Sequence, residues 1–220
     1  CASAHHWARE LVALGHEVRL MPAQYVKPYV KRGKNDAADA EGICEAVTRP
    51  TMRFVGVKSP DQQATMMLHR VRKILTRQRT QLSNALRAHM AEFGIIAATG
   101  RGGLERLIAV IAEQDDARLP DEARACLSVL SAQLEMVKDR ILDNDRRILA
   151  DARRTEAGRR LMKIPGIGPL LASAIVACVP DPATFSNARS LSAWIGLTPR
   201  QNSSGGKERL GRITKMGDKY

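Results

Sequence analysis

The apolar positions in the middle of the chain follow the spacing of long helices. Residues 61–93 are predicted to form one helix, whose apolar stripe only Gln78 interrupts. The residues of this stripe are Leu68, Val71, Leu75, Leu82 and Ala85. A second long helix is predicted from about Pro120, with steps of three and four residues and Asn144 at the one polar step. Its stripe consists of Leu127, Leu130, Leu134, Val137, Ile141 and Ile148.

The two long helices are separated by a glycine-rich joint, TGRGG at residues 99–103, and a shorter helix. This order predicts an antiparallel helical hairpin or coiled coil. A stripe of this kind is also typical of an ordinary buried core, so the pattern alone leaves both interpretations open.

The pattern before residue 60 is mixed. Residues 3–14 have helical spacing and end before Gly15, and residues 16–21 (HEVRLM) have the apolar positions of a short strand. The other elements expected here are a loop over residues 23–35, a helix over 36–47 and a short extended segment over 52–57. A helix, a turn and a strand in this order predict an α/β region.

The region from Arg159 begins with a turn between two helices. Residues 161–179 (LMKIPGIGPLLASAIVACV) have the pattern of a helix-hairpin-helix. In such a turn Gly166 and Gly168 leave backbone N–H groups open, and these groups can bind a phosphate at a helix N-terminus without reading base sequence. A tight turn that binds no ligand would have the same pattern. A further helix is expected over residues 188–195.

The last segment, residues 196–220 (GLTPRQNSSGGKERLGRITKMGDKY), interleaves small, glycine and basic residues. We expect a flexible backbone there that approaches phosphates closely while basic side chains neutralise them. The candidate phosphate-neutralising residues are Arg200, Lys207, Arg209, Arg212 and Lys215.

Composition narrows the class of protein. The chain has 220 residues, is 44% hydrophobic and carries a net charge of +12. Residues 152–220 hold 12 Lys and Arg against 4 Asp and Glu, a surplus that favours a polyanionic partner, nucleic acid first. A basic surface with no such partner is the alternative. The longest apolar run, residues 170–179, is shorter than the ~20 residues of a membrane-spanning helix, and the four cysteines are too scattered for a zinc or disulfide framework. We expect a soluble intracellular protein.

Two aspartates in the helix expected over residues 36–47 are candidate metal ligands. Asp36 and Asp39 are three residues apart, so a helix places both carboxylates on one face. A divalent cation would relieve their repulsion, and oxygen-only ligation suits Mg²⁺ or Mn²⁺. On spacing alone, solvated acids that pair with Lys34 or Arg32 are the better interpretation, and two carboxylates are too few for a complete site.

Ser203 and Ser204 precede two glycines and a dense basic run. A serine hydroxyl beside bound phosphate can act as a nucleophile when a base or metal takes its proton, although serine next to glycine is by default only a turn. His5 and His6 point in different directions on a helix and are not expected to share a metal. His69 and His89 are expected on the surface or in the stripe of the long helix.

Three blocks in this order resemble the transposases of the insertion sequence 110 family, most closely its 1111 subgroup. They are CASAHHWARELVALGHEVRLMPAQYVKPYVKRGKNDAADAEGICEAVTRP, then PGIGPLLASAIVA, then GLTPRQNSSGGKERLGRITKMGDKY, and the resemblance spans nearly the whole chain. It implies an α/β plus α protein of three parts. These are the end of a RuvC-like domain of ribonuclease H fold (1–60), a coiled-coil helical arm (61–155) and a mostly helical transposase domain with a helix-hairpin-helix (156–220).

The resemblance also implies site residues. The family has an Asp-Glu-Asp-Asp metal site, whose last two acids fall on Asp36 and Asp39, and a serine nucleophile that matches Ser204 best, with Ser203 second. The first Asp and the Glu would precede Cys1, so we expect a fragment that binds nucleic acid but does not recombine it. The candidate nucleic-acid contacts near the acids and in the hairpin turn are Lys27, Lys31, Arg32, Lys34, Gly166 and Gly168.

The implied activity is cleavage and rejoining of DNA through a phosphoserine linkage, guided by an element-encoded RNA. The implied setting is a homodimer or homotetramer in the bacterial cytoplasm, associated with the nucleoid. Two other classes stay open on the residues: a non-catalytic helix-hairpin-helix protein that binds DNA or DNA junctions, and a coiled-coil assembly protein with incidental basic charge.

Overall fold

The computed structural model describes residues 3–31 and 35–217. The chain divides into two compact units, one of residues 64–174 and one that combines residues 1–63 with 175–220. Most of the described backbone is helical, and its regular strands form one two-stranded sheet. The α/β plus α class expected from sequence is compatible with this content, and the division into three parts stays a prediction.

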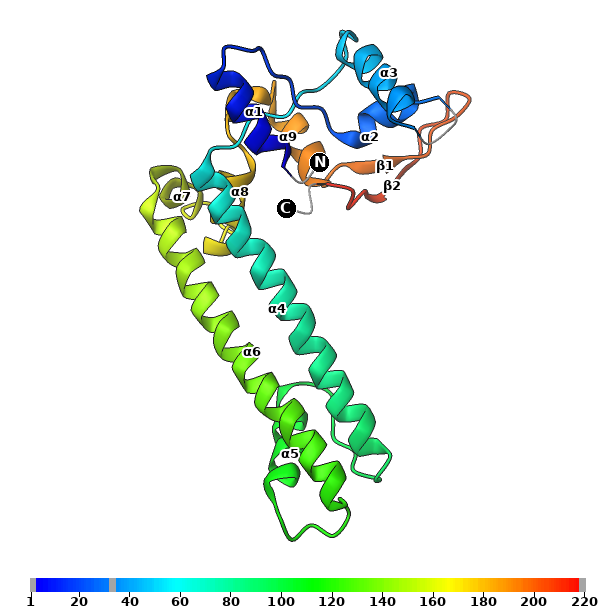
Figure 1. Ribbon diagram of the computed structural model, residues 1–220. Helices are drawn as coiled ribbons and strands as arrows, with labels where there is room; N and C mark the ends of the chain where they lie inside the picture. The colour runs from blue at the N-terminus through cyan, green and yellow to red at the C-terminus, as the bar shows by residue number, and fades with distance from the viewer. Residues whose placement is uncertain (1–2, 32–34, 218–220) are drawn as a thin grey trace. The chain divides into compact units, whose positions relative to one another are not determined.

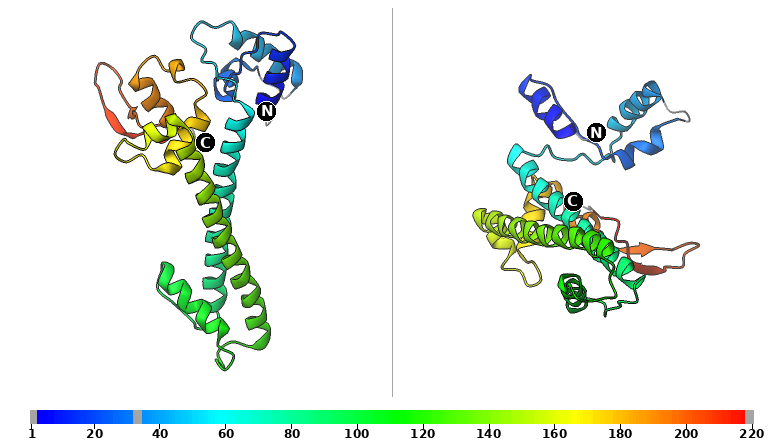
Figure 2. Two further views of the ribbon diagram at one scale, coloured as in Figure 1. Left: turned by 90° about the vertical axis from the view of Figure 1, so that its left-hand side faces the viewer. Right: turned by 60° about the horizontal axis from the view of Figure 1, so that its bottom comes forward.

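The unit of residues 64–174 is a helical arm. Helices α4 (Pro60–Ala91) and α6 (Asp121–Arg154) run antiparallel, and α5 (Arg101–Ala112) packs at one end of the pair, as Figures 1 and 2 show. The predicted helical hairpin is therefore confirmed. The short helix α7 (Glu156–Leu161) follows α6 directly.

The core of the arm lies where α4, α5 and α6 meet. It is a single cluster of apolar side chains that includes Leu86, Leu107 and Leu134, each at most 2% exposed. The predicted stripe of α6 is confirmed, since its residues are buried except for the half-buried Leu130. Asn144 is buried too, and its Nδ2 donates to the backbone carbonyl of Leu68 on α4 at 3.0 Å.

The predicted stripe of α4 is only partly correct. Leu82 is buried, but Val71 is 41% exposed. The heptad assignment also omitted Met66, Leu86 and Met90, which are all buried. The buried positions of α4 do not repeat every seven residues along its whole length, because its end near α5 has two helices to pack against and the other end has different neighbours.

A buried arginine holds together the end of the arm near α5. Arg124 is 5% exposed, and its guanidinium donates to the carbonyls of Val110 and Ile111 at 3.1 Å and of Asp116 at 2.6 Å, and also to that of Glu113. These carbonyls belong to the last turn of α5 and the loop after it, where intrahelical donors are missing. The planar, multi-donor guanidinium satisfies them together, which explains how a charge is tolerated there.

The other unit carries short elements. Before residue 63 they are α1 (Ala4–Ala13), α2 (Ala23–Val26), the 3₁₀ helix η1 (Lys27–Tyr29) and α3 (Asp36–Val47). The predicted helices are confirmed, whereas the strand expected over residues 16–21 is reduced to one antiparallel bridge between Leu20 and Val55. The expected loop of residues 23–35 contains α2 and η1, because Pro22 and Pro28 preset the backbone for short helical turns.

The C-terminal elements begin with α8 (Pro169–Cys178), which crosses the boundary between the two units. They continue with η2 (Pro182–Thr184), α9 (Ala188–Ile195) and the strands β1 (Pro199–Gln201) and β2 (Leu210–Ile213). The two strands pair antiparallel, with Pro199 opposite Ile213 and Gln201 opposite Leu210. This β-hairpin (Figure 1) was not predicted from the sequence, and the expected flexibility of the segment stays a prediction.

Candidate functional site

The two candidate metal ligands lie in the first turn of α3. Asn35 caps this helix: its Oδ1 accepts a hydrogen bond from the backbone N–H of Ala38 at 2.7 Å. Asp36 and Asp39 are both exposed in this first turn. The local sequence therefore presents two carboxyl groups, about one turn apart, to solvent.

Close packing fixes the position of α3 against the residues before it. Gly42 and Ala46 are buried, and a Cβ added at Gly42 would lie 2.8 Å from Val30 Cγ2. A larger residue at position 42 would push α3 away from the segment that contains η1. The lack of a side chain at Gly42 thus lets the two segments touch and holds the start of α3 in place.

Basic residues near α3 are only partly placed as expected. Lys31 Nζ lies 2.6 Å from Glu41 Oε1, and both side chains are exposed. Lys31 therefore pairs with the glutamate and not with either aspartate. Lys27 is an exposed residue of η1. Arg32 and Lys34 lie outside the described residues.

The carboxylates of Asp36 and Asp39 are suitable ligands for a hard divalent cation, but two of them are too few for a complete site. Carboxylate oxygens are the ligands that Mg²⁺ and Mn²⁺ prefer. Within the described ranges no group of three or more His, Cys, Asp or Glu residues is arranged to hold a metal ion. Asp36 and Asp39 could therefore supply two ligands, and the other ligands would have to come from outside this set.

The two candidate nucleophiles lie at the tip of the β-hairpin. Ser204 and Lys207 exchange backbone hydrogen bonds, at 3.3 Å and 3.1 Å, around a two-residue turn of Gly205 and Gly206. Both glycines have positive φ, +56° and +76°, as a tight hairpin turn of this type requires. The SSGGK sequence therefore encodes the turn itself.

The hydroxyls of the two serines have different surroundings. Ser203 Oγ accepts a hydrogen bond from the backbone N–H of Arg209 at 3.1 Å. Ser204 is exposed, and its hydroxyl makes no hydrogen bond to any described residue. Ser203 thus helps to close the hairpin, whereas the hydroxyl of Ser204 is available to a ligand.

All of the basic side chains predicted for this segment are exposed. Arg200 is in β1, Arg212 is in β2, and Lys207 and Arg209 lie between the strands. Lys215 follows β2 and has a φ of +52°. The hairpin thus presents cations on both strands and at its tip, next to the Ser204 hydroxyl, which is the arrangement expected of a surface that contacts phosphates.

The turn between α7 and α8 has an open backbone. Gly166 has a φ of +87°, and a Cβ added at Gly166 or at Gly168 would meet nothing within 4 Å. Residues 163–166 and Gly168 are exposed, and α8 begins at Pro169. The predicted order of helix, glycine turn and helix is present, and the turn leaves room for a ligand at the start of α8.

The arm contains a buried polar cluster that was not predicted from the sequence. His69 is 1% exposed, not on the surface, and its Nε2 lies 3.0 Å from Ser173 Oγ. Ser173 Oγ donates to Asp151 Oδ2 at 2.8 Å, and Thr65 Oγ1 donates to Asp151 Oδ1 at 3.2 Å. Burial lowers the pKa of His69, the Asp151 charge raises it and the Arg72 charge lowers it. His69 therefore favours the neutral state, in which Nε2–H donates to Ser173.

This cluster contains Ser, His and Asp but not the geometry of a nucleophilic triad. Ser173 lies between His69 and Asp151, whereas in a triad the histidine bonds to both the acid and the serine. Ser173 is also 0% exposed, so a substrate cannot reach its hydroxyl. The cluster therefore joins α4, α6 and α8 as a structural network. The one sequence signal for it is that Thr65 and His69 are four residues apart on one helix face.

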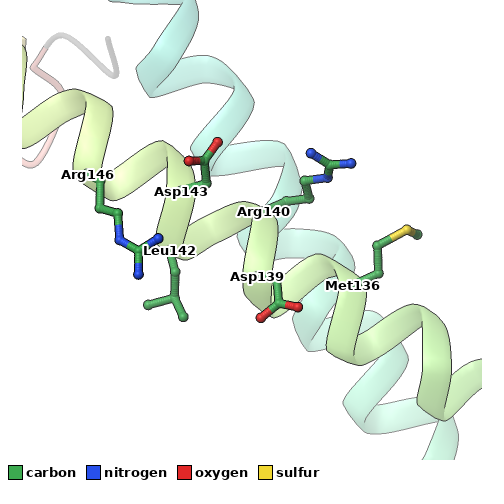
Figure 3. Close-up of a pocket in the computed structure, with 6 residues that line it drawn as sticks. All are labelled: Met136, Asp139, Arg140, Leu142, Asp143 and Arg146. Carbon is green, nitrogen blue, oxygen red and sulfur yellow. The ribbon is translucent and has the colours of Figure 1, made fainter.

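The surface of α6 has a shallow pocket that does not form a site. All six lining residues come from this one helix: Met136, Asp139, Arg140, Leu142, Asp143 and Arg146. Figure 3 shows that their side chains point away from α6 in several directions and do not converge. Acids and bases alternate along this surface, which is typical of a solvated helix face.

Two family models of transposases match this chain, one in its N-terminal part and one in its C-terminal part. A family model described as "Transposase IS116/IS110/IS902 family" matches residues 158–220, and a transposase model of the DEDD type named for IS110 matches residues 2–95. The chain belongs to this family of insertion-sequence transposases. No described helix is both long and apolar enough to cross a membrane.

Individual relatives agree with the family assignment. The chain is 48% identical over 218 residues to a putative transposase of Sinorhizobium fredii, a match that covers 99% of this chain and 56% of the relative. It is 48% identical to a probable family 20 transposase of Pseudomonas aeruginosa, over 100% and 65% of the two chains. It is 38% identical to the transposase for insertion sequence element IS1111A of Coxiella burnetii, over 99% and 60%. The chain thus spans 56% to 65% of the length of these relatives.

Proposed function

We propose that the protein to which this chain belongs is a DNA transposase that cuts DNA strands and rejoins them through a covalent serine intermediate. The observation that carries the proposal is the exposed Ser204 hydroxyl at a glycine turn, on a hairpin whose exposed charges are almost all basic. A serine placed among arginines and lysines can approach a phosphodiester, and the cations stabilise the charge that develops on phosphorus. The family of the chain supports the same activity.

The proposed step conserves atoms and charge. Ser204 Oγ attacks the phosphorus of a phosphodiester, a new Oγ–P bond forms and the bond from phosphorus to one deoxyribose oxygen breaks. The hydroxyl proton passes to a carboxylate or water, and the leaving deoxyribose oxygen takes up a proton. A hydroxyl of a second DNA strand then attacks the phosphoserine, which restores the serine and completes strand transfer. Ser203 is the second candidate, but its Oγ accepts the Arg209 N–H.

Asp36 and Asp39 are proposed to hold a divalent cation, Mg²⁺ or Mn²⁺, as the last two acids of an Asp-Glu-Asp-Asp set. Their exposure at the capped start of α3 supports this role. When such an ion is bound, it activates an attacking oxygen and stabilises a leaving oxygen on phosphorus. The remaining Asp and Glu are proposed to come from residues outside this chain.

The partners are proposed from the same family resemblance. They are duplex DNA, an element-encoded guide RNA that pairs with target and donor DNA, and further copies of the protein in a dimer or tetramer. The proposed DNA contacts are the turn at Gly166 and Gly168 and the basic residues of the hairpin. The site of action is proposed to be the bacterial cytoplasm, on the nucleoid.

Strand transfer by the full-length transposase tests the proposal. Ser204→Ala and Asp36→Asn are expected to abolish strand transfer without loss of DNA binding. The matched controls are Ser203→Ala, which removes the neighbouring hydroxyl, and Glu41→Gln, which neutralises an acid of α3 that pairs with Lys31. Both controls are expected to retain strand transfer. Full strand transfer by Ser204→Ala and Asp36→Asn together with intact binding would favour the alternative, a non-catalytic protein that binds DNA or DNA junctions.

A further inference from the structure

Lys207 lies directly across the hairpin turn from the exposed serine, Ser204. Their backbone groups exchange two hydrogen bonds, from the Ser204 N–H to the Lys207 carbonyl at 3.3 Å and from the Lys207 N–H to the Ser204 carbonyl at 3.1 Å. Residues that exchange both bonds are opposite each other, with Cα atoms about 5.5 Å apart and side chains on the same face of the ribbon. The side chain of Lys207 therefore starts beside the hydroxyl of Ser204.

Further hydrogen bonds hold this pair in register. On the side away from the turn, the N–H of Asn202 donates to the Arg209 carbonyl at 2.8 Å, and the N–H of Arg209 donates to Ser203 Oγ at 3.1 Å. On the other side, Gly205 and Gly206 close the turn with positive φ. The backbone thus fixes where both side chains begin before any DNA binds, and such positioning of two reacting groups is what catalysis requires.

The ammonium group of Lys207 is available to a ligand. Lys207 is exposed, and its side chain makes no hydrogen bond or ion pair with any described residue. Glu208, the one acid in the sequence between residues 199 and 213, forms no ion pair within the described part of the chain either. The hydroxyl of Ser204 and the ammonium of Lys207 can therefore contact the same phosphodiester.

We propose that Lys207 is the general acid of strand cleavage, which protonates the deoxyribose oxygen that leaves when Ser204 attacks phosphorus. The inference rests on the proposed function and names a further catalytic residue for it. In an in-line attack the leaving oxygen lies on the far side of phosphorus from Ser204 Oγ. Lys207 fits this position because it starts about 5 Å to the side of the serine and has a flexible four-carbon stem that can extend past the phosphorus.

A lysine fits this role better than the arginines of the same hairpin do. A lysine ammonium can lose a proton, whereas an arginine guanidinium stays protonated in proteins. During cleavage the ammonium of Lys207 gives one proton to the leaving oxygen as the bond from that oxygen to phosphorus breaks, and a neutral amine remains. During rejoining the amine takes the proton of the hydroxyl that attacks the phosphoserine, which restores the ammonium. Lys207 therefore returns to its starting state after each strand transfer.

Substitution by arginine separates proton transfer from phosphate binding. Lys207→Arg keeps a positive charge at this position but cannot give up a proton. The full-length variant is expected to bind DNA as the unmodified transposase does, measured by fluorescence anisotropy. In single-turnover cleavage it is expected to form the covalent adduct about 100-fold to 10,000-fold more slowly. The matched control, Lys138→Arg, makes the same change on the arm, where Lys138 Nζ lies 2.7 Å from Glu135 Oε1, and is expected to keep the unmodified rate.

Sulfur in the leaving position makes the test specific for a general acid. One DNA substrate has sulfur in place of the 5′ bridging oxygen of the scissile phosphate and another has sulfur in place of the 3′ bridging oxygen, so one of the two carries it in the leaving position. A thiolate leaves without a proton, so with that substrate the rates of Lys207→Arg and the unmodified transposase are expected to lie within about 10-fold of each other.

Two results would overturn the inference. One is an unmodified rate for Lys207→Arg on all-oxygen DNA, which would mean that the positive charge alone is needed. The other is an equal slowing of Lys207→Arg on all three substrates, which would mean that the lost step is not proton transfer to the leaving group. An adduct on a residue other than Ser204 in the unmodified transposase would contradict the proposed function itself.

Discussion

The hydroxyl of Ser203 accepts a hydrogen bond from the backbone N–H of Arg209, 3.1 Å away across the β-hairpin. The next residue, Ser204, uses its backbone and not its side chain to close the same turn, through the bonds with Lys207. The two adjacent serines therefore have different roles. Ser203 stabilises the hairpin with its hydroxyl, whereas the hydroxyl of Ser204 stays exposed.

Hydrogen exchange of the hairpin amides tests this division. Ser203→Ala removes the acceptor of the Arg209 amide, so the exchange of that amide is expected to become several-fold faster, in keeping with the loss of about 1 kcal/mol for one hydrogen bond. Ser204→Ala is expected to leave the Arg209 amide unchanged, because no hydrogen bond from the Ser204 side chain is involved. Equal acceleration in both variants would show that the hydroxyls are not distinguished in this way.

Replacement of the buried Arg124 tests how much its hydrogen bonds stabilise the end of the arm near α5. Arg124→Met keeps much of the apolar stem but leaves carbonyls of Val110, Ile111 and Asp116 without their donor. We expect a loss of about 2 to 3 kcal/mol in the free energy of unfolding, measured by urea denaturation. The control Arg140→Met, at an exposed position of α6, is expected to change it by less than about 0.5 kcal/mol.

The arm is expected to lose stability in mild acid because of His69. Burial lowers the pKa of His69 in the folded chain, so below about pH 6.5 the unfolded chain binds a proton that the folded chain resists. The contribution to stability is complete above pH 6.5 and falls as the pH drops below that value, by at most about 1.4 kcal/mol per pH unit. Asp151 opposes the shift and Arg72 adds to it.

Thermal melts between pH 5 and pH 8 measure this dependence. His69→Gln is expected to lower the melting temperature at every pH. It is also expected to remove the fall in melting temperature between pH 6.5 and pH 5 that protonation of His69 causes. The control His89→Gln changes an exposed histidine of the same helix and is expected to keep the slope. An unchanged slope in His69→Gln would mean that His69 is not the titrating group.

The helices of this chain can be predicted from its sequence because each has its own periodic pattern and boundary signals. Residues 36–47 begin after an asparagine cap and match α3, and the alternation of three and four residues from Leu127 to Ile148 matches the buried face of α6. The stripe of α4 is less readable, because its neighbours change along its length. Burial of Met66 and His69 depends on segments far away in the chain, such as Ser173, and no local pattern encodes that contact.

The candidate site was only partly predictable for a similar reason. Exposure of Asp36, Asp39 and Ser204 follows from local signals, namely a helix start and a glycine turn. The sequence could not distinguish Ser203 from Ser204 by chemistry, because the difference arises from a hydrogen bond to Arg209 across a β-hairpin that was not predicted.

The central claim is that Ser204 forms a covalent bond with DNA, and mass spectrometry of the trapped intermediate tests it most directly. Full-length transposase is incubated with a DNA substrate that is nicked so that rejoining is blocked, and the protein is then digested and sequenced. The account predicts a nucleotide linked through phosphate to the Ser204 peptide fragment, absent in Ser204→Ala and retained in Ser203→Ala. A linkage to another residue, or strand transfer with no covalent intermediate, would contradict it.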